Sequence, residues 1–322
     1  MYKFKKQIAF LFGCIALITY LSIHFSSSQD SVRVVSTQKE GTHMQIYLKD
    51  EDRTLIPLSI PVSEELSEDE KLQLMFSYMS GKQSVKGFLP LFQKECTLQR
   101  VIVQKGIASL YLDDSFKNYK AEDELRVLEA ITWGSTQFHD IEQVKLFLND
   151  QPLTSMPVAN TPIPEVLNRS IGINHFETSA SSLHDSTSIT VFATKKIEGN
   201  EYLVPRSRRI QVSGDSLSAH VNSIITDISA SSELLQPLYA DDIEVKDFKM
   251  QDGTLCVELN KNILSSDASV KQNVYDTLVL SLATLEGIQR VEVRVDGVVV
   301  TPKSQKAEAV SKYELMYNEV TF

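Results

Sequence analysis

The sequence predicts an α+β protein made of two tandem small modules behind an N-terminal transmembrane helix. Each module is expected to be a sheet of mainly antiparallel strands, backed by two helices on one face. Three observations support this fold class. The chain matches itself when it is shifted by 147 residues. Within each copy the apolar residues change from a period of two to a period near 3.6. An uncharged run follows three lysines near the start of the chain.

The composition is that of a folded, acidic protein. Its 322 residues exceed the roughly 100–200 of one ordinary domain, so two domains are expected. Hydrophobic residues make up 42% and charged residues 23% of the chain, which excludes a disordered or fibrous protein. Three cysteines exclude a disulfide-dense scaffold. The net charge of −10 argues against non-specific nucleic-acid binding, so no nucleic-acid partner is expected.

Residues 1–28 are predicted to be a cytoplasmic stub and a membrane anchor. The run 8–25 carries no charged side chain, and its 18 residues fall within the roughly 17–25 that cross a bilayer core. Lys3, Lys5 and Lys6 precede this run, whereas all 42 acidic residues follow it. The positive charge is expected on the cytoplasmic side, so the bulk of the chain lies outside the cytoplasm.

The expected localisation is therefore the cell membrane, crossed once. Two alternatives stay open for the same segment. Ser26, Ser27 and Ser28 offer small residues for signal-peptide cleavage, although the apolar run is longer than that of most cleaved signals. Leu11-Phe12-Gly13-Cys14 loosely resembles a lipoprotein box, which would place a lipid on Cys14.

Residues 32–153 are predicted to form the first module, and its elements follow in order. Apolar stretches at 44–48 and 55–58 indicate an opening hairpin. A helix is expected next from the helical spacing of four residues: Leu72, Leu74, Met75 and Tyr78. A second hairpin then turns at Gly106, with residues 101–103 before it and alternating Ala108, Leu110 and Leu112 after it.

The first module closes with a second helix and two strands. One apolar stripe of the helix is made by residues at helical spacing: Val127, Ile131, Gly134 and Phe138. Val144, Leu146 and Leu148 then alternate as a strand, and Asn149-Asp150 turns the chain into a short edge strand. The uncovered face of the sheet is expected to be solvated or to serve as an interface.

Residues 188–302 repeat these elements as the second module. Only seven of the 56 pairs between residues 98–153 and 245–300 are identical, but the apolar positions correspond in type. Asp252-Gly253 stands between alternating strands, which is a strong hairpin signal. The helix before it shows a clear apolar stripe: Leu217, Val221, Ile224, Ile225 and Ile228. Residues 154–187 are expected to be a Pro/Ser linker, and residues 303–322 a short helix or a mobile tail.

Three segments resemble the GerMN-domain family. The opening hairpins at 46–57 and 191–206 carry the first likeness, including Leu55-Ile56-Pro57 and Leu203-Val204-Pro205. Residues 136–144 look like the family's helix end followed by F-P-G-I-x-x-V. Residues 169–174, Arg-Ser-Ile-Gly-Ile-Asn, are similar to the G-I-N segment between tandem copies. The resemblance covers residues from about 40 to 302 and implies two tandem domains of this family.

The sequence also departs from the family pattern. His139-Asp140 replaces the usual Pro-Gly in the first copy, and Glu286-Gly287 stands there in the second. Some family members are lipoproteins, whereas the lipoprotein box here is poor. The resemblance implies an envelope-attached, non-catalytic interaction protein associated with bacterial sporulation or germination. It names no partner.

The sequence offers no recognised catalytic motif, so no enzyme is predicted. G-x-S-x-G, H-E-x-x-H, Walker A and G-x-G-x-x-G are all missing, and the six histidines show no metal-ligand spacing. His139-Asp140 and His184-Asp185 could pair a base with an orienting acid, but both stand in polar, turn-like stretches. We therefore predict no catalytic, cofactor-binding or metal-binding residue, and no cofactor.

Two charged clusters are candidates for binding. The acidic stretch Glu64–Glu70 lacks the pattern of a calcium loop and is interpreted as the solvated start of a helix. Arg206, Arg208 and Arg209 form the candidate interaction site. They are interpreted either as a contact for an acidic partner or polyanionic envelope polymer, or as a solvated strand edge.

These observations favour a membrane-anchored, extracytoplasmic scaffold that binds envelope or sporulation-complex proteins. Self-association into a homo-oligomer is left open. The alternative is an envelope ligand-binding protein or a cell-wall-acting enzyme, with its site at the junction of the two modules.

Overall fold

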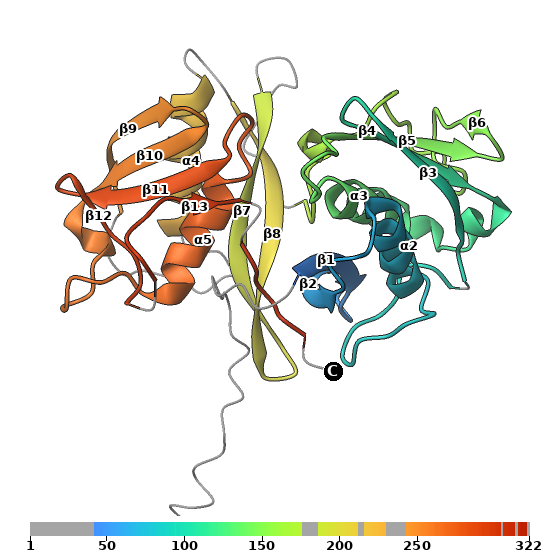
Figure 1. Cartoon of the computed structure of the whole chain (residues 1–322), viewed down its shortest axis with the longest axis horizontal. Helices are drawn as coiled ribbons and strands as arrows, with labels where there is room; N and C mark the ends of the chain where they lie inside the picture. Colours follow the sequence, from blue (N-terminus) through green and yellow to red (C-terminus); the bar gives the residue numbers. More distant parts are fainter. Residues whose placement is uncertain are drawn as a thin grey trace, which may run out of the picture. The chain divides into compact units, whose positions relative to one another are not determined.

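Two apolar stretches build the opening hairpin of the first module. Strands β1 (Thr42–Lys49) and β2 (Leu55–Val62) pair antiparallel, with Tyr47 opposite Pro57 (Figure 1). Residues 55–60 of β2 are all buried, so both faces of this strand are covered. One face packs into the core of its own module, and the other lies toward the second module.

Helices α2 (Glu68–Met79) and α3 (Glu124–Ser135) follow the predicted stripes, except that α3 ends before Phe138, which lies in the turn after the helix. Helix α2 begins at Ser67, whose backbone N–H donates to the Glu70 carboxylate at 2.9 Å. This capping contact confirms that the acidic stretch is a helix start. Trp133 of α3 is 1% exposed and belongs to the core of the first module.

A four-stranded sheet completes the first module. Its order is β3 (Leu98–Gln104), β4 (Ile107–Leu112), β5 (Gln143–Leu148) and β6 (Gln151–Pro152). Strands β3 and β4 form the predicted antiparallel hairpin. Strands β4 and β5 are parallel, because α3 carries the chain from one end of the sheet back to the other. Two short 3₁₀ helices, Asp114–Lys117 and Ala121–Asp123, lie between β4 and α3.

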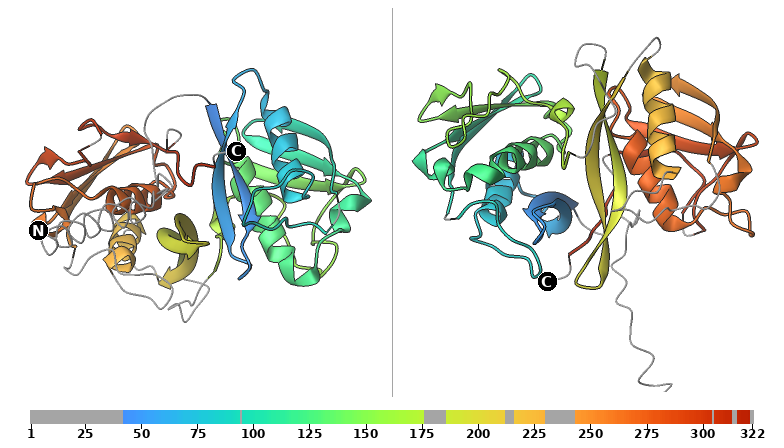
Figure 2. Two further views of the ribbon diagram at one scale, coloured as in Figure 1. Left: turned by 90° about the horizontal axis from the view of Figure 1, so that it is seen from below. Right: turned by 180° about the vertical axis from the view of Figure 1, so that it is seen from behind.

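The layering differs from the predicted single sheet. The hairpin β1–β2 is a sheet of its own, and α2 and α3 lie between it and the four-stranded sheet (Figures 1 and 2). Helix α2 contacts β1 on one side and β3 on the other, and α3 contacts β1 and β5. Both helices are therefore buried on two sides, which explains why ten of the twelve residues of α3 are buried.

The second module repeats this architecture. Its hairpin is longer and twisted, its sheet has the order β12-β11-β10-β9, and β13 pairs with β11. Strands β10 and β11 are parallel, as β4 and β5 are. Its elements are β7 (Ser186–Ile197), β8 (Asn200–Gln211), α4 (Ser216–Ser229), β9 (Val245–Gln251), β10 (Thr254–Leu259), a 3₁₀ helix (Lys261–Ile263), α5 (Gln272–Leu282), β11 (Arg290–Val295), β12 (Val298–Val299) and β13 (Val310–Ser311).

The stretches after each module pack onto the fold. Within the expected linker, Met156, Leu167 and Ile173 are buried in the core of the first module. Glu124 of α3 fixes this stretch, because its carboxylate accepts the backbone N–H groups of residues 158, 159 and 161. The expected C-terminal helix or mobile tail is instead strand β13 and a segment around Tyr317, which is 4% exposed.

The structure is a computed structural model that describes residues 42–93, 95–175, 186–211, 216–229, 243–303, 305–312 and 315–320. All of them belong to one compact unit of the chain. The expected anchor, residues 1–28, and the alternatives at Cys14 and residues 26–28 lie outside this part. Within it, every helix is too short or too polar to cross a membrane.

Candidate functional site

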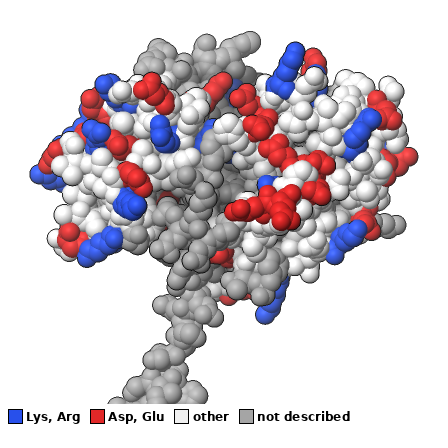
Figure 3. Space-filling view, in the orientation of Figure 1, with Lys and Arg blue, Asp and Glu red and all other residues white. Residues whose placement is uncertain are grey.

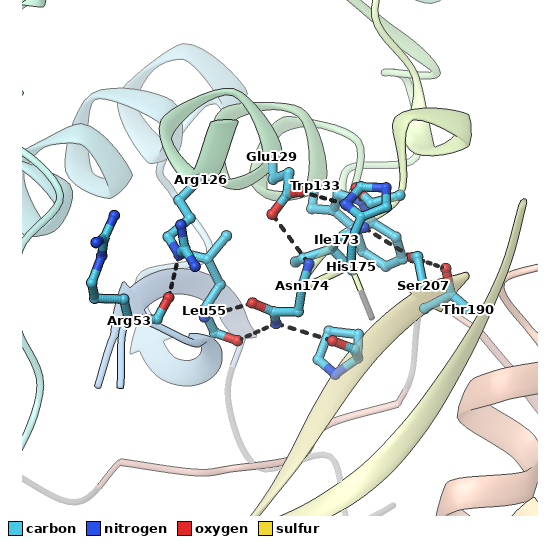
Figure 4. Close-up of polar contacts among 12 residues, drawn as sticks. Arg53, Leu55, Arg126, Glu129, Trp133, Ile173, Asn174, His175, Thr190 and Ser207 are labelled. Carbon is cyan, nitrogen blue, oxygen red and sulfur yellow. Dashed lines mark hydrogen bonds and ion pairs between the residues drawn. The ribbon is translucent and has the colours of Figure 1, made fainter. Parts of the chain in front are cut away.

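The two modules meet at a seam between strands β2 and β8. The strands lie against each other but belong to different sheets, so their facing edges need other hydrogen-bond partners. Asn174 supplies them on one side (Figure 4). The Leu55 N–H donates to Asn174 Oδ1 at 2.8 Å, and Asn174 Nδ2 donates to the carbonyls of Leu55 and Pro205 at 2.8 and 3.0 Å.

Asn318 makes the reciprocal contacts from the C-terminal segment. The Leu203 N–H donates to Asn318 Oδ1 at 2.8 Å, and Asn318 Nδ2 donates to the carbonyls of Leu203 and Pro57, both at 2.7 Å. Asn318 is fully buried. Each side-chain amide thus pairs with both backbone groups of one residue, as a neighbouring strand would. The same amide also donates to a carbonyl on the strand of the other module.

The backbone next to each asparagine docks onto the opposite hairpin. The Ser207 N–H donates to the Ile173 carbonyl at 2.8 Å, and the Ser59 N–H donates to the Asn318 carbonyl at 3.0 Å. The segment that follows each module, which we call its tail (around Asn174 and around Asn318), therefore lies on the hairpin of the other module. Both asparagines adopt the left-handed conformation, with φ of 47° at Asn174 and 54° at Asn318, which asparagine tolerates better than most residues.

Gly172 explains the glycine of the Gly-Ile-Asn motif. Its φ is +76°, and an added Cβ would lie 2.6 Å from His175 Nε2 and 2.8 Å from Ser207 Cβ. Only glycine combines this backbone conformation with so close an approach. One of the three segments that carry the family resemblance therefore builds one side of the seam.

A buried carboxylate holds the Asn174 segment from the first module. Glu129 of α3 is 1% exposed and accepts the Asn174 N–H at 3.1 Å. It also contacts His175 Nδ1 at 2.9 Å, and this hydrogen bond raises the pKa of His175. The Trp133 indole N–H donates to the Gly172 carbonyl at 2.9 Å, and the Arg169 guanidinium lies 4.6 Å from the Trp133 ring.

The equivalent acid in the second module has a different environment. Asp276 occupies the position on α5 that Glu129 has on α3, and it is also 1% exposed. Gln272 Nε2 donates to Asp276 Oδ1 at 2.8 Å, whereas Oδ2 has no hydrogen-bond partner among the described residues. Burial raises the pKa of Asp276 to about 7. The shorter aspartate therefore does not reproduce the contacts that Glu129 makes with Asn174 and His175 in the first module.

The outer faces of the two sheets differ in chemistry. In the first module, Tyr111 and Phe147 stack at 4.6 Å across β4 and β5, and the Arg100 guanidinium lies 3.9 Å from the Tyr111 ring. In the second module the same face carries Cys256 and an ion pair between Arg294 and Glu292 at 2.6 Å. The outer face of the first module is therefore aromatic around one arginine, and that of the second is mixed in charge.

The structure does not bring the three predicted arginines together on one surface. Arg208 binds Asp227 of α4 through two hydrogen bonds of 2.6 Å. Arg209 points to the opposite face of β8, where its charge acts on His175. Arg206 is partly buried, and desolvation lowers its pKa. Their predicted interaction role stays a prediction.

A shallow hollow of about 620 Å³ lies at the turn between β3 and β4. Glu68, Asp140 and Glu142 line it, together with Val103, Lys105, Gly106 and His139. Burial and the nearby Asp140 raise the pKa of Glu68. Acidic side chains also gather over the start of α2 in Figure 3.

The His139-Asp140 pair at the hollow is exposed to solvent. Its two side chains lie 3.1 Å apart and are 76% and 74% exposed. His184-Asp185 lies outside the described residues. Among those that the structure describes, no three acidic, histidine or cysteine side chains gather as a metal site would require.

Sequence reasoning missed Asn174 and Asn318 as the residues of the seam. Gly172-Ile173-Asn174 stood out only through the resemblance, and Asn318 stood in an unremarkable polar tail. A usable signal was present in Pro57 and Pro205, which occupy matching strand positions. Proline within a strand indicates an edge strand, because it has no N–H to donate to a neighbouring strand. Both strands were therefore expected to contact a different part of the chain along this edge.

Known proteins are similar to this chain in sequence and in fold. The family described as "Germane: Sporulation and spore germination" matches residues 45–154 and again residues 190–301. The spore germination protein GerM of Bacillus subtilis (strain 168) is 31% identical over an alignment of 299 positions, which covers 89% of this chain and 81% of that protein. The solved tandem GerMN domains of the sporulation protein GerM from Bacillus subtilis match with a TM-score of 0.71 and 26% identity, over 82% of this chain and 99% of that one.

The two family matches fall one on each module, in agreement with the duplicated elements and the reciprocal seam. The chain belongs to the Germane family and carries two tandem GerMN domains.

Proposed function

We propose that this chain is a membrane-anchored, extracytoplasmic protein that acts in spore formation or germination by binding other proteins, without a reaction of its own. The family and its relative from Bacillus subtilis are known as sporulation and spore germination proteins. Similarity over most of both chains supports carrying that role to this protein.

The observation that carries the proposal is the outer face of the first sheet. Arg100, Tyr111 and Phe147 form one row across three strands, and Ile102 beside them is 42% exposed. Aromatic residues and arginine are enriched where proteins bind each other, because they combine large contact area with directional contacts. The seam then holds this surface in a fixed relation to the second module.

The anchor predicted from residues 8–25 adds to the proposal. A protein confined to a membrane surface meets partners in the same membrane at a raised effective concentration, so modest contacts suffice for binding. The candidate arginines, Arg206, Arg208 and Arg209, are partly buried and contribute less to this proposal than the sheet face does.

The alternative function requires a cleft between the modules. The seam is instead occupied by buried side chains, including Asn318, Tyr317 and Leu203, and by the two docked tails. Among the described residues, the Asn174 and Asn318 side chains already pair with both strands at the seam. This packing favours a protein-binding role over an envelope ligand-binding protein or a cell-wall enzyme with its site at the junction.

The proposal is tested on the full chain in sporulating cells. Membranes are crosslinked, solubilised in mild detergent and resolved by blue-native electrophoresis, and the complexes are identified by mass spectrometry. We expect the chain in assemblies larger than itself, and we expect Tyr111→Ala with Phe147→Ala to reduce them. A chain that stays monomeric throughout sporulation and germination contradicts the proposal.

A further inference from the structure

Strand β3 is an exposed edge of the first sheet with little protection against pairing. It lies at the end of the order β3-β4-β5-β6. Ile102 and Val103 are 42% and 37% exposed, and Arg100 is the only charged residue of the strand. Soluble proteins usually block such an edge with lysines, prolines or bulges in its centre, since an open edge can pair with another chain.

The second module provides a matched comparison. Strand β9 occupies the equivalent edge, and it carries Lys246, Asp247 and Lys249. Lys249 stands where the first module has Ile102. One copy of the duplicated edge therefore has a central charge that discourages pairing, and the other has an exposed apolar side chain at that position.

The acidic hollow lies beside the open edge. Val103 of β3 lines it, and so do Lys105 and Gly106 of the following turn. Three carboxylates, those of Glu68, Asp140 and Glu142, face one lysine there. A segment that paired with β3 and continued past Gln104 would carry its next side chains into a negative field.

We propose that β3 accepts an extended segment of a partner protein as an added strand, and that this segment is apolar at alternate positions with a lysine or arginine at the end over the acidic hollow. The inference rests on the proposed function, because it assumes that the chain acts by binding proteins. Main-chain hydrogen bonds to β3 supply affinity, while the hollow fixes the register and direction of the segment.

Charge complementarity favours a separate partner over a second copy of this chain. Consider β3 paired antiparallel with β3 of another copy, with the two Ile102 residues opposite each other. Gln99 of one copy would then lie opposite Lys105 of the other, and the negative charge of both hollows would gain no new cationic partner. Arg100 points to the other face of the sheet, where it already contacts Asp150 at 3.1 Å and the Tyr111 ring. Self-pairing therefore brings no cation to the three carboxylates.

The test uses photo-crosslinking from the full chain in sporulating cells. The photoreactive residue benzoylphenylalanine replaces Gln104 at the end of β3 or, as a matched control, Gln251 at the equivalent place on β9. A third probe replaces Tyr111 on the outer face of the first sheet. We expect Gln104 to capture a segment with the stated pattern, as mapped by mass spectrometry of the crosslinked peptide. Ile102→Lys should lower this yield at least tenfold, whereas Lys249→Ile should leave it unchanged.

A charge exchange tests the register. Glu142→Lys should lower the crosslinking yield from position 104, and replacing the basic residue of the captured segment by glutamate should restore it. Proline substitutions in the segment should weaken binding only at alternate residues, those whose N–H faces β3. Circular dichroism of Ile102→Lys should match the parent, because Ile102 lies on the solvent side of the sheet.

The outcomes separate the inference from the proposed function. Capture from a probe at Tyr111 or Gln251, with none from Gln104, overturns the strand-addition site and leaves the binding function standing. A crosslink from Gln104 to a second copy of this chain overturns the choice of occupant. Absence of any captured protein at all three positions overturns both proposals.

Discussion

Replacing Asn318 by glycine should measure how strongly the seam stabilises the fold. Glycine tolerates the φ of 54° at this position, so the substitution removes the amide without adding backbone strain. It leaves the Leu203 N–H, the Leu203 carbonyl and the Pro57 carbonyl without their partner in a buried site. A buried polar group that loses its partner costs about 1–3 kcal/mol.

Three such groups, which are not independent, suggest a loss of about 3–5 kcal/mol in the free energy of unfolding. For a protein of this size, 1 kcal/mol corresponds to about 2–4 °C in Tm, so we expect Tm to fall by roughly 6–20 °C. Glycine also makes the unfolded chain more flexible, which adds about 0.5–1 kcal/mol to the loss.

Asn160→Gly is the matched control. Asn160 also has a positive φ, of 58°, but its side chain is exposed. Both substitutions share the change in unfolded-state flexibility, so the difference between them reports on the Asn318 amide. Urea unfolding of the purified proteins, followed by circular dichroism, gives both values. If Asn318→Gly unfolds within about 1 kcal/mol of Asn160→Gly, the amide does not hold the seam and the reasoning fails.

Three further predictions concern titratable groups. The Glu129 contact raises the pKa of His175, so the contact stabilises the fold below the unfolded pKa of about 6.5, and this stabilisation is lost as pH rises through the folded pKa. Glu129→Gln should therefore cost more stability in urea unfolding at pH 5.5 than at pH 8.5, and equal losses at the two pH values would contradict this. Burial raises the pKa of Asp276 to about 7, so its ionisation destabilises the fold as pH rises from about 4 to 7; Asp276→Asn should be more stable than the parent at pH 8, by roughly 2–4 kcal/mol, and similar to it at pH 4, whereas a gain independent of pH would refute the assignment. Burial raises the pKa of Cys96 to about 12, and Cys256 is less buried. Iodoacetamide at pH 8 should therefore modify Cys256 before Cys96, as followed by mass spectrometry, and faster labelling of Cys96 would refute the burial argument.

Local periodicity predicted the elements whose residues contact near neighbours along the chain. The alternation of Leu255, Val257 and Leu259 after Asp252-Gly253 gave the hairpin β9–β10, and both turn residues have positive φ. The stripe from Leu217 to Ile228 gave helix α4. These signals are strong because a strand or a helix repeats its environment every two or about 3.6 residues.

The seam could not be predicted in this way, because its contacts join residues far apart in the sequence. Asn174 bonds Leu55 across 119 positions, and Asn318 bonds Pro57 across 261. A single buried asparagine has no period, so composition places it in a loop. The separate hairpin layer was missed for a related reason: β2 is apolar on both faces, and alternation alone does not show what covers the second face.

The exchange of tails across the seam bears on how such a chain could arise. Two copies of a single-module protein could make the same contacts about a twofold axis, each placing its asparagine against the hairpin of the other. Joining them in one chain turns an association between molecules into a contact within one molecule, so it no longer depends on concentration. Gene duplication then frees the two outer edges to diverge, because a change at Ile102 no longer forces the same change at Lys249.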